Sequence, residues 1–219
     1  MLNPKIIKRN KRYGNNYWRG KGRKVNLREV TFYSDLEYDH WLSVEMDPNV
    51  ITYCEQPSEK EISFVFEGEL RSTLIDMWVL FKGGIEEYRE VKYTSELRPG
   101  HKTYERNMRQ IGAQRKWCED NGLTHRVIDE TMLRTSPYIM GNRVKLLGYI
   151  NNTEYDDRYI QLMDFVQTEK LTLHSLMQNV KLPLNQLLVS CSWLTYKGII
   201  DMDITSRPIS LQTEVWKRE

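Results

Sequence analysis

The sequence predicts an α/β fold, in which a mixed β-sheet flanked by helices is followed by a smaller domain of winged-helix type. A hairpin with two glycines precedes a long helix and a further strand, and such a crossover makes the sheet mixed. Near the C-terminus, three helix patterns precede two short strands, which is the element order of a winged helix. With 219 residues, the chain is long enough for a main domain and a small one.

We expect a basic arm over residues 1–30, a main domain over 31–150 and a winged-helix domain over 151–219. The second boundary is placed at the turn sequence Asn151-Asn152-Thr153. No apolar stretch approaches the roughly 20 residues of a membrane span. Three widely separated cysteines argue for a reducing cytoplasm and against a zinc or disulfide framework.

The main domain is expected to begin with a helix from Phe32 to Met46, which Asp47-Pro48 ends. A first strand follows over Val50–Pro57, and a second over Glu61–Phe66 has its turn at Gly68.

The next two strands form a hairpin, Leu74–Phe81 and Ile85–Tyr93, joined by Lys82-Gly83-Gly84. A three-residue loop of this kind pairs Phe81 with Ile85, because glycine accepts the positive φ that the loop needs. Counting outward from that pair places Asp76 opposite Glu90.

A helix over His101–Asn121 follows, with Tyr104, Met108 and Ile111 as its predicted apolar stripe. Leu123–Ile128 returns as a strand, and a helical stretch then reaches Ile150. In the C-terminal domain the pattern predicts a helix around Tyr155–Val166, helices over Leu173–Val180 and Pro183–Lys197, and strands over Ile199–Ile204 and Ile209–Trp216.

Asp76, Glu90 and Lys92 are the main candidates for a functional site. Asp76 interrupts an apolar run that reads as a buried strand, and buried charges are rare unless they are paired or bind metal. Two carboxylates directly opposite each other repel by up to about 1 kcal/mol, which a divalent cation would relieve. The alternative is a solvated hairpin face, on which the three charges meet by chance.

Glu37 is a candidate third acid, because it falls on the apolar stripe of the first helix. A competing explanation is equally specific. Ser34-Asp35-Leu36-Glu37 fits a capping box, in which the glutamate binds the backbone at the start of the helix. The residues alone leave both explanations open.

The net charge of +2 hides a basic N-terminus, where residues 1–30 contain ten basic side chains and one acidic one. Tyrosine, tryptophan and glycine residues are interleaved with them, a composition typical of an arm that binds phosphates and stacks on bases. A disordered, solubilising tail is the alternative. The candidate nucleic-acid-binding residues are Lys8, Arg9, Lys11, Arg12, Arg19, Lys21, Arg23 and Lys24.

The predicted winged helix lacks the positive charge expected of a DNA-binding domain. Its would-be recognition helix, Pro183–Lys197, contains Lys197 as its one charged residue. Because phosphate contacts supply most non-specific affinity for DNA, protein docking or a structural role is favoured over base reading.

Taken in order, Ser34–Glu37, Tyr53-Cys54-Glu55-Gln56-Pro57, Asp76 and Glu90-Val91-Lys92 resemble TnsA. That family is the restriction-endonuclease-like subunit of heteromeric bacterial cut-and-paste transposases, including elements guided by CRISPR complexes. The resemblance covers about residues 30–150, and the distal winged helix matches the family's layout.

The resemblance implies a restriction-endonuclease-like fold and a metal-dependent DNA endonuclease, with Glu37, Asp76 and Lys92 at catalytic positions. At position 90 some members have glutamine, and Glu90 is the commoner nuclease form. Asp76, Glu90, the Val91 carbonyl and Glu37 would bind Mg²⁺, with Mn²⁺ able to substitute. The implied reaction is hydrolysis of phosphodiester bonds at the 5′ ends of the transposon.

The implied partners are the double-stranded DNA of the transposon ends, a TnsB-like DDE transposase that cuts and joins the 3′ ends, and a TnsC-like AAA+ ATPase. The expected location is the bacterial cytoplasm, at the nucleoid, with no membrane involved. Two alternatives stay open. One is a stand-alone restriction or repair nuclease of the same fold, and the other is a non-catalytic assembly module that keeps the acidic cluster as a relic.

Overall fold

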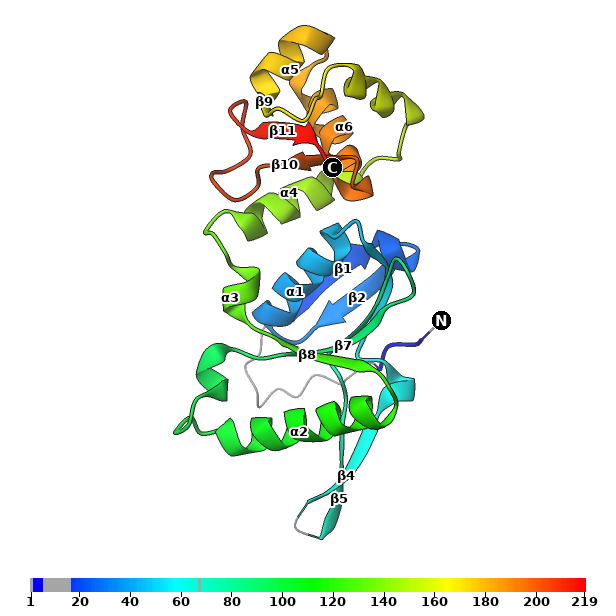
Figure 1. Cartoon of the computed structure of the whole chain (residues 1–219), viewed down its shortest axis with the longest axis vertical. Coiled ribbons are helices and arrows are strands. Elements are labelled where there is room, and N and C mark those ends of the chain that lie inside the picture. The colour runs from blue at the N-terminus through cyan, green and yellow to red at the C-terminus, as the bar shows by residue number, and fades with distance from the viewer. Residues whose placement is uncertain (1, 6–16, 67) are drawn as a thin grey trace. The chain divides into compact units, whose positions relative to one another are not determined.

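The computed structural model describes residues 2–5, 17–66 and 68–219, and it divides into two compact units (Figure 1). Unit 1 comprises Met1–Glu45 and Val50–Leu133, and unit 2 comprises Met46–Asn49 and Arg134–Glu219. Among the described residues, no helix combines the length and the apolar character needed to span a bilayer.

Unit 1 is built on the predicted mixed sheet. Its four strands, in the order β3-β6-β7-β8, are β3 (Val50–Glu55), β6 (Met77–Phe81), β7 (Glu86–Val91) and β8 (Thr124–Ile128). The first three are antiparallel, and β8 is parallel to β7. The crossover between β7 and β8 runs through helix α2 (Tyr104–Asp120), as the sequence predicted.

The hairpin of β6 and β7 has the register that the glycine loop predicts. Met77 pairs with Arg89, and Phe81 N donates to Ile85 O at 2.8 Å. Continuing this pairing by one residue sets Asp76 opposite Glu90, and Val91 N donates to Asp76 Oδ2 at 2.8 Å. The acidic pair is therefore placed by the turn.

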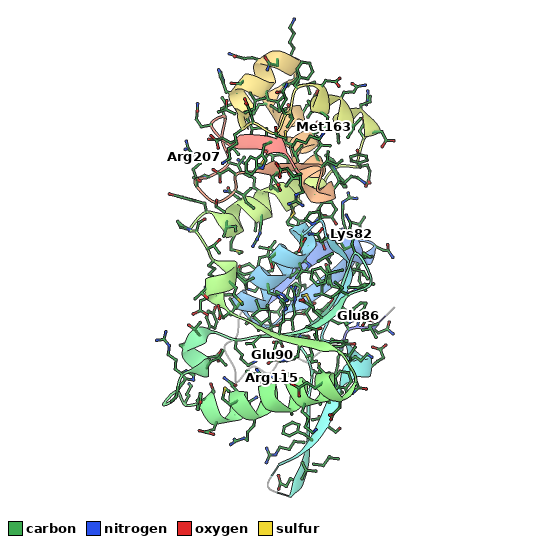
Figure 2. All side chains as sticks on the ribbon, in the orientation of Figure 1. Lys82, Glu86, Glu90, Arg115, Met163 and Arg207 are labelled. Atoms are coloured by element: carbon green, nitrogen blue, oxygen red, sulfur yellow. The ribbon has the colours of Figure 1, made fainter. Side chains whose placement is uncertain are left out.

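Helices lie on both faces of the sheet. From strand β7, Tyr88 packs edge to face on Trp117 of α2, while the next residue, Arg89, reaches His40 of helix α1 (Asp35–Met46). Side chains alternate along a strand, so α1 and α2 cover opposite faces. Glu90 belongs to the α2 face (Figure 2).

The buried face of α2 differs from the predicted stripe. Met108 is 41% exposed, whereas the residues that are buried beside Ile111 include the polar Asn107 and Gln114. Because Glu90 is buried under this helix, amide donors replace apolar side chains there. The polar face of the helix is turned inward for that reason.

Residues 18–32 form a folded hairpin, where the sequence suggested an arm. Strands β1 (Trp18–Gly22) and β2 (Arg28–Phe32) pair antiparallel, and a 3₁₀ turn, η1 (Arg23–Val25), joins them. Val30 and Phe32 are buried. A Cβ at Gly20 would lie 2.4 Å from the Trp41 ring, so glycine is what lets β1 approach α1.

The strand predicted over Glu61–Phe66, with its turn at Gly68, forms one arm of a second hairpin, and the returning strand was not predicted. Strands β4 (Ile62–Phe66) and β5 (Glu69–Thr73) pair only with each other and extend beyond the sheet (Figure 1). A 3₁₀ turn, η2 (Ser58–Lys60), precedes them, and Ile62 anchors their base in the core with Tyr88.

Between β7 and α2 lies the 3₁₀ turn η3 (Thr94–Leu97), and unit 1 ends with the short helix α3 (Glu130–Leu133). The break after Leu133 falls earlier than the expected boundary at 151. Helix α4 (Ile139–Asn151), which buries Leu146 and Ile150, packs with α6 (Leu184–Lys197), so it belongs to unit 2.

Unit 2 combines helices with a three-stranded sheet in the order β10-β11-β9. The segment around Tyr155–Val166 is a 3₁₀ helix instead of the expected α-helix, and strand β9 was not predicted. Its elements are α4 (Ile139–Asn151), η4 (Asp157–Asp164), β9 (Leu171–Thr172), α5 (Leu173–Val180), α6 (Leu184–Lys197), β10 (Ile200–Met202) and β11 (Glu214–Lys217).

Candidate active site

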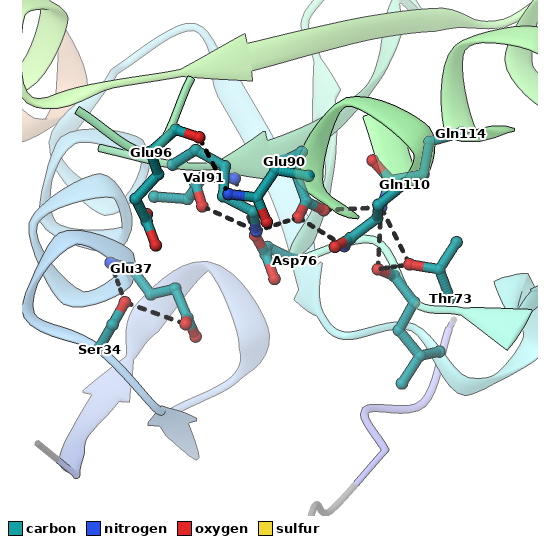
Figure 3. Close-up of polar contacts among 12 residues, drawn as sticks. Ser34, Glu37, Thr73, Asp76, Glu90, Val91, Glu96, Gln110 and Gln114 are labelled. Atoms are coloured by element: carbon teal, nitrogen blue, oxygen red, sulfur yellow. Dashed lines mark hydrogen bonds and ion pairs between the residues drawn. The ribbon is translucent and has the colours of Figure 1, made fainter. Parts of the chain in front are cut away.

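Asp76, Glu90 and Lys92 converge at one end of the β6–β7 hairpin (Figure 3). Lys92 Nζ donates to Glu90 Oε1, and Asp76 Oδ2 accepts from the backbone of Val91, between Glu90 and Lys92. Glu90 is 0% exposed, so the alternative of a solvated acidic face is excluded.

The structure confirms the capping explanation for Glu37, and its role as a third acid at a metal site stays a prediction. Its carboxylate accepts from Tyr33 N at 3.1 Å and from Ser34 Oγ at 3.0 Å, and Ser34 Oγ accepts from Glu37 N at 3.1 Å. These are helix-capping contacts. Glu37 also lines the same pocket as Asp76. The cap holds the carboxylate in place at the pocket surface.

Glu90 is held by two glutamines that the sequence reasoning missed. Gln110 Nε2 donates to Glu90 Oε1 and Gln114 Nε2 donates to Glu90 Oε2, each at 2.7 Å. The signal in the sequence is two amides spaced i, i+4 on the helix that follows the Glu-x-Lys strand, since that spacing puts both on one face.

Gln56 was part of the recognised motif, but its role emerges only from the fold. Its φ is 41°, a left-handed value that is unusual for a residue preceding proline. Gln56 N donates to Asp76 O at 2.9 Å, and Gln56 Nε2 lies 3.3 Å from Glu37 Oε2. This strained residue therefore ties the start of β6 to the first turn of α1.

Burial raises the pKa of all three carboxyl groups. Burial, followed by the charge of Asp76, raises the pKa of Glu37 to about 7 and that of Glu90 to about 8. Burial also raises the pKa of Asp76. For Lys92, burial opposes the charged form, but the carboxylates of Asp76 and Glu90 outweigh it and raise the pKa. Lys92 is therefore protonated at neutral pH.

Asp76 and Glu37 open onto a pocket of about 640 Å³. Glu90 and Lys92 lie behind this surface, with 0% and 16% of their side chains exposed. The pocket is lined by Tyr33, Glu37, Gln56, Phe64, Arg71, Ser72, Thr73, Leu74, Asp76, Arg106, Arg109 and Gln110.

The donor chemistry of the pocket suits a hard cation. Within the described part of the chain, no three His, Cys, Asp or Glu side chains are placed to hold a metal ion together. Mg²⁺ does not need such a set, because it keeps several waters and binds through one or two carboxylates plus substrate phosphates. Burial is the main cause of the raised pKa values of Asp76 and Glu37, and a cation bound at the pocket would oppose it by favouring the ionised carboxylates.

The predicted basic residues fall into two groups. Lys8, Arg9, Lys11 and Arg12 lie outside the described residues. Arg19, Lys21, Arg23 and Lys24 lie on β1 and η1, where Arg19 Nη1 is 3.3 Å from Glu29 Oε1 and Lys24 Nζ donates to Val50 O. A role in DNA binding for these residues stays a prediction.

The raised pKa values predict a pH dependence of stability. A carboxyl whose pKa is higher in the folded protein than in the unfolded chain weakens folding as it ionises, so stability falls as pH rises through about 7 and 8. Asp76→Asn removes the charge that raises both pKa values. We expect it to flatten this loss, by on the order of 1–2 kcal/mol at pH 8.5.

Urea unfolding followed by circular dichroism, at steps between about pH 6.5 and 8.5, measures this difference. Buried His40 and half-buried His125, whose pKa values burial lowers to about 3 and about 4, stay neutral in the folded protein over this range. The exposed Asp120→Asn is the control and should follow the wild type. Equal pH slopes for Asp76→Asn and the wild type would contradict the prediction.

A mixed sheet with helices on both faces, whose central hairpin presents Asp76 beside Glu90-Val91-Lys92, fits the restriction-endonuclease-like class of nucleases. Residues 47–130 match the family model described as TnsA-like endonuclease N terminal. This segment of unit 1 is therefore similar to the N-terminal endonuclease domain of the TnsA-like family. The matched segment contains Asp76, Glu90 and Lys92 and begins after Glu37. No curated protein matches the sequence.

Proposed function

We propose that the protein is the metal-dependent DNA endonuclease subunit of a heteromeric bacterial transposase, and that it hydrolyses phosphodiester bonds at the 5′ ends of the transposon. One observation carries the proposal. Asp76 lines a pocket, with Glu90 and Lys92 directly behind it, within the segment that matches a TnsA-like endonuclease.

Asp76 and Glu37 would hold Mg²⁺ or Mn²⁺ at the pocket surface, with Glu90 and the Val91 carbonyl behind them. To bind the cation through Oε1, Glu90 would first have to give up its hydrogen bond from Lys92 or from Gln110, because both now donate to that oxygen. The bound cation would supply Lewis-acid polarisation of the phosphate and a lower pKa for the attacking water.

The side chains around the proposed cation would stabilise charge in the reaction and hold the carboxylates in place. Lys92 is positively charged and buried among carboxylates, so its raised pKa suits it to stabilise negative charge on the phosphoryl oxygens or to orient water. It is not suited to remove a proton. Gln110 and Gln114 keep Glu90 in one rotamer, and Gln56 keeps Asp76 and Glu37 at a fixed separation.

For unit 2 we propose a winged helix that docks on protein partners. The order α4, β9, α5, α6, β10, β11 supports the assignment, since β10 and β11 form the antiparallel pair expected of a wing. Helix α6 has Lys197 as its one charged residue, and Lys197 Nζ sits 4.2 Å from the Tyr155 ring centroid. The proposed partners are a TnsB-like transposase and a TnsC-like ATPase, acting on nucleoid DNA.

Incubation with supercoiled plasmid bearing transposon ends tests the function, with the partner transposase present and with Mg²⁺, Mn²⁺ or EDTA. We expect nicks at the 5′ ends with either metal and none with EDTA. Cleavage without the transposase would instead indicate a stand-alone nuclease. Absence of nicking with partner and metal present would indicate an assembly module, a conclusion strengthened if calorimetry finds no carboxylate-dependent Mn²⁺ binding.

A further inference from the structure

Helix α2 presents two arginines to the same pocket that contains the acidic residues. Arg106, Arg109 and Gln110 are spaced i, i+3, i+4, so they lie on one face of the helix, and all three line the pocket. Gln110 Nε2 donates to Glu90 at 2.7 Å, which orients this face toward the acidic cluster. Arg106 and Arg109 therefore lie on the face of α2 that is turned toward the acidic cluster.

The β4–β5 hairpin contributes another part of the pocket lining. Phe64 of β4 and Arg71 of β5 pair across the hairpin, and both line the pocket. Arg71 Nη2 donates to Glu69 Oε2 at 2.8 Å. One pocket thus contains two aromatic rings, three guanidinium groups and two carboxylates.

The intramolecular contacts of Arg106 do not explain its position. Arg106 is exposed, and within the described residues it forms no hydrogen bond or ion pair. Exposed arginines on a helix are commonly solvated, but this one faces a concave surface whose floor carries Glu37 and Asp76. A phosphodiester approaching those carboxylates would be repelled unless positive charge stood beside it.

We propose that Arg106 and Arg109 form a phosphate-binding wall, which holds the backbone of the DNA strand that enters the pocket. The proposal rests on the proposed function and adds to it the residues that position the substrate. Arginine suits this task because its planar guanidinium binds two phosphate oxygens at once and remains charged at any working pH. Such contacts position a strand without reading its sequence.

The test compares Arg106→Gln/Arg109→Gln with Arg115→Gln/Lys116→Gln in the full chain. Both pairs lie on α2 and remove two positive charges, but Arg115 and Lys116 are exposed and are not part of the pocket lining. Each pair is made in the Asp76→Asn background, and binding to a fluorescent duplex of about 30 base pairs is followed by anisotropy between about 50 and 200 mM salt.

For the Arg106/Arg109 pair we expect affinity to fall about tenfold and the salt slope to drop by about one to two. The Arg115/Lys116 pair should keep the affinity of its parent within about threefold. In the nicking assay with Asp76 intact, the first pair should raise KM much more than it lowers kcat.

Equal binding by the two pairs, with both as folded as the parent by circular dichroism, would overturn the phosphate wall. That result would leave the nuclease proposal intact if the wild type nicks. Loss of nicking in the wild type would instead overturn the nuclease proposal, while the binding comparison would still decide the role of the arginines.

Discussion

Asp76→Asn should abolish nicking, lowering the rate by at least roughly 10²–10³-fold with metal and transposase present. Asparagine keeps the volume of the side chain and can still accept from Val91 N, the contact that aspartate now makes at 2.8 Å. It removes the negative charge that would attract the cation. The same variant should be more stable than the wild type above pH 7, so activity and stability are expected to move in opposite directions.

Initial nicking rates and Mn²⁺ calorimetry together check this expectation. The variant should lose both nicking and the metal-binding heat, while its circular dichroism spectrum stays unchanged. Asp120→Asn, the same substitution at the exposed end of α2, should leave both signals intact. Nicking by Asp76→Asn at near the wild-type rate would remove Asp76 from the catalytic site.

Lys92→Met should lower the nicking rate by about 10²–10³-fold while DNA binding changes little. Methionine approximates the lysine stem but removes the ammonium that donates to Glu90 Oε1. Glu90, which is 0% exposed, would then lack its cationic partner and would take up a proton near neutral pH. The site would lose a positive charge and, at the same time, a carboxylate.

Lys82→Met is the matched control, because Lys82 is an exposed lysine in the turn of the same hairpin. It should nick like the wild type. Lys92→Arg keeps the charge, but its larger head group must fit a position where 16% of the side chain is exposed, so partial activity is expected. Single-turnover nicking and anisotropy measure the two effects separately. A Lys92→Met rate within tenfold of wild type would rule out a catalytic role for this charge.

Local patterns were sufficient for the sheet and for its register. Two glycines after Lys82 set the turn, and the turn places Asp76 opposite Glu90. The crossover helix and the parallel strand β8 followed from helix and strand periodicity. These features depend on residues close together in the sequence, which is why sequence reasoning reached them.

The inward face of α2 and the burial of the β1–β2 hairpin required contacts between distant segments. Gln110 and Gln114 look like ordinary helix-surface residues until Glu90, some twenty positions earlier, is seen beneath them. Likewise, the basic composition of residues 1–30 concealed Val30, which is a core residue of the folded β1–β2 hairpin. Charge counts describe a segment's composition but not what covers it.

By itself, the sequence determined which residues are the candidates for the chemistry, because a tight turn and the alternation of side chains along a strand place Asp76, Glu90 and Lys92 close together in space. Only the tertiary structure decided their environment. Packing of α2 buried Glu90 under two amides, Gln56 linked Asp76 to Glu37, and Arg106 and Arg109 joined the pocket lining. Burial and long-range neighbours set the pKa values and the charge of the site, and these depend on chain segments that meet only in the folded protein.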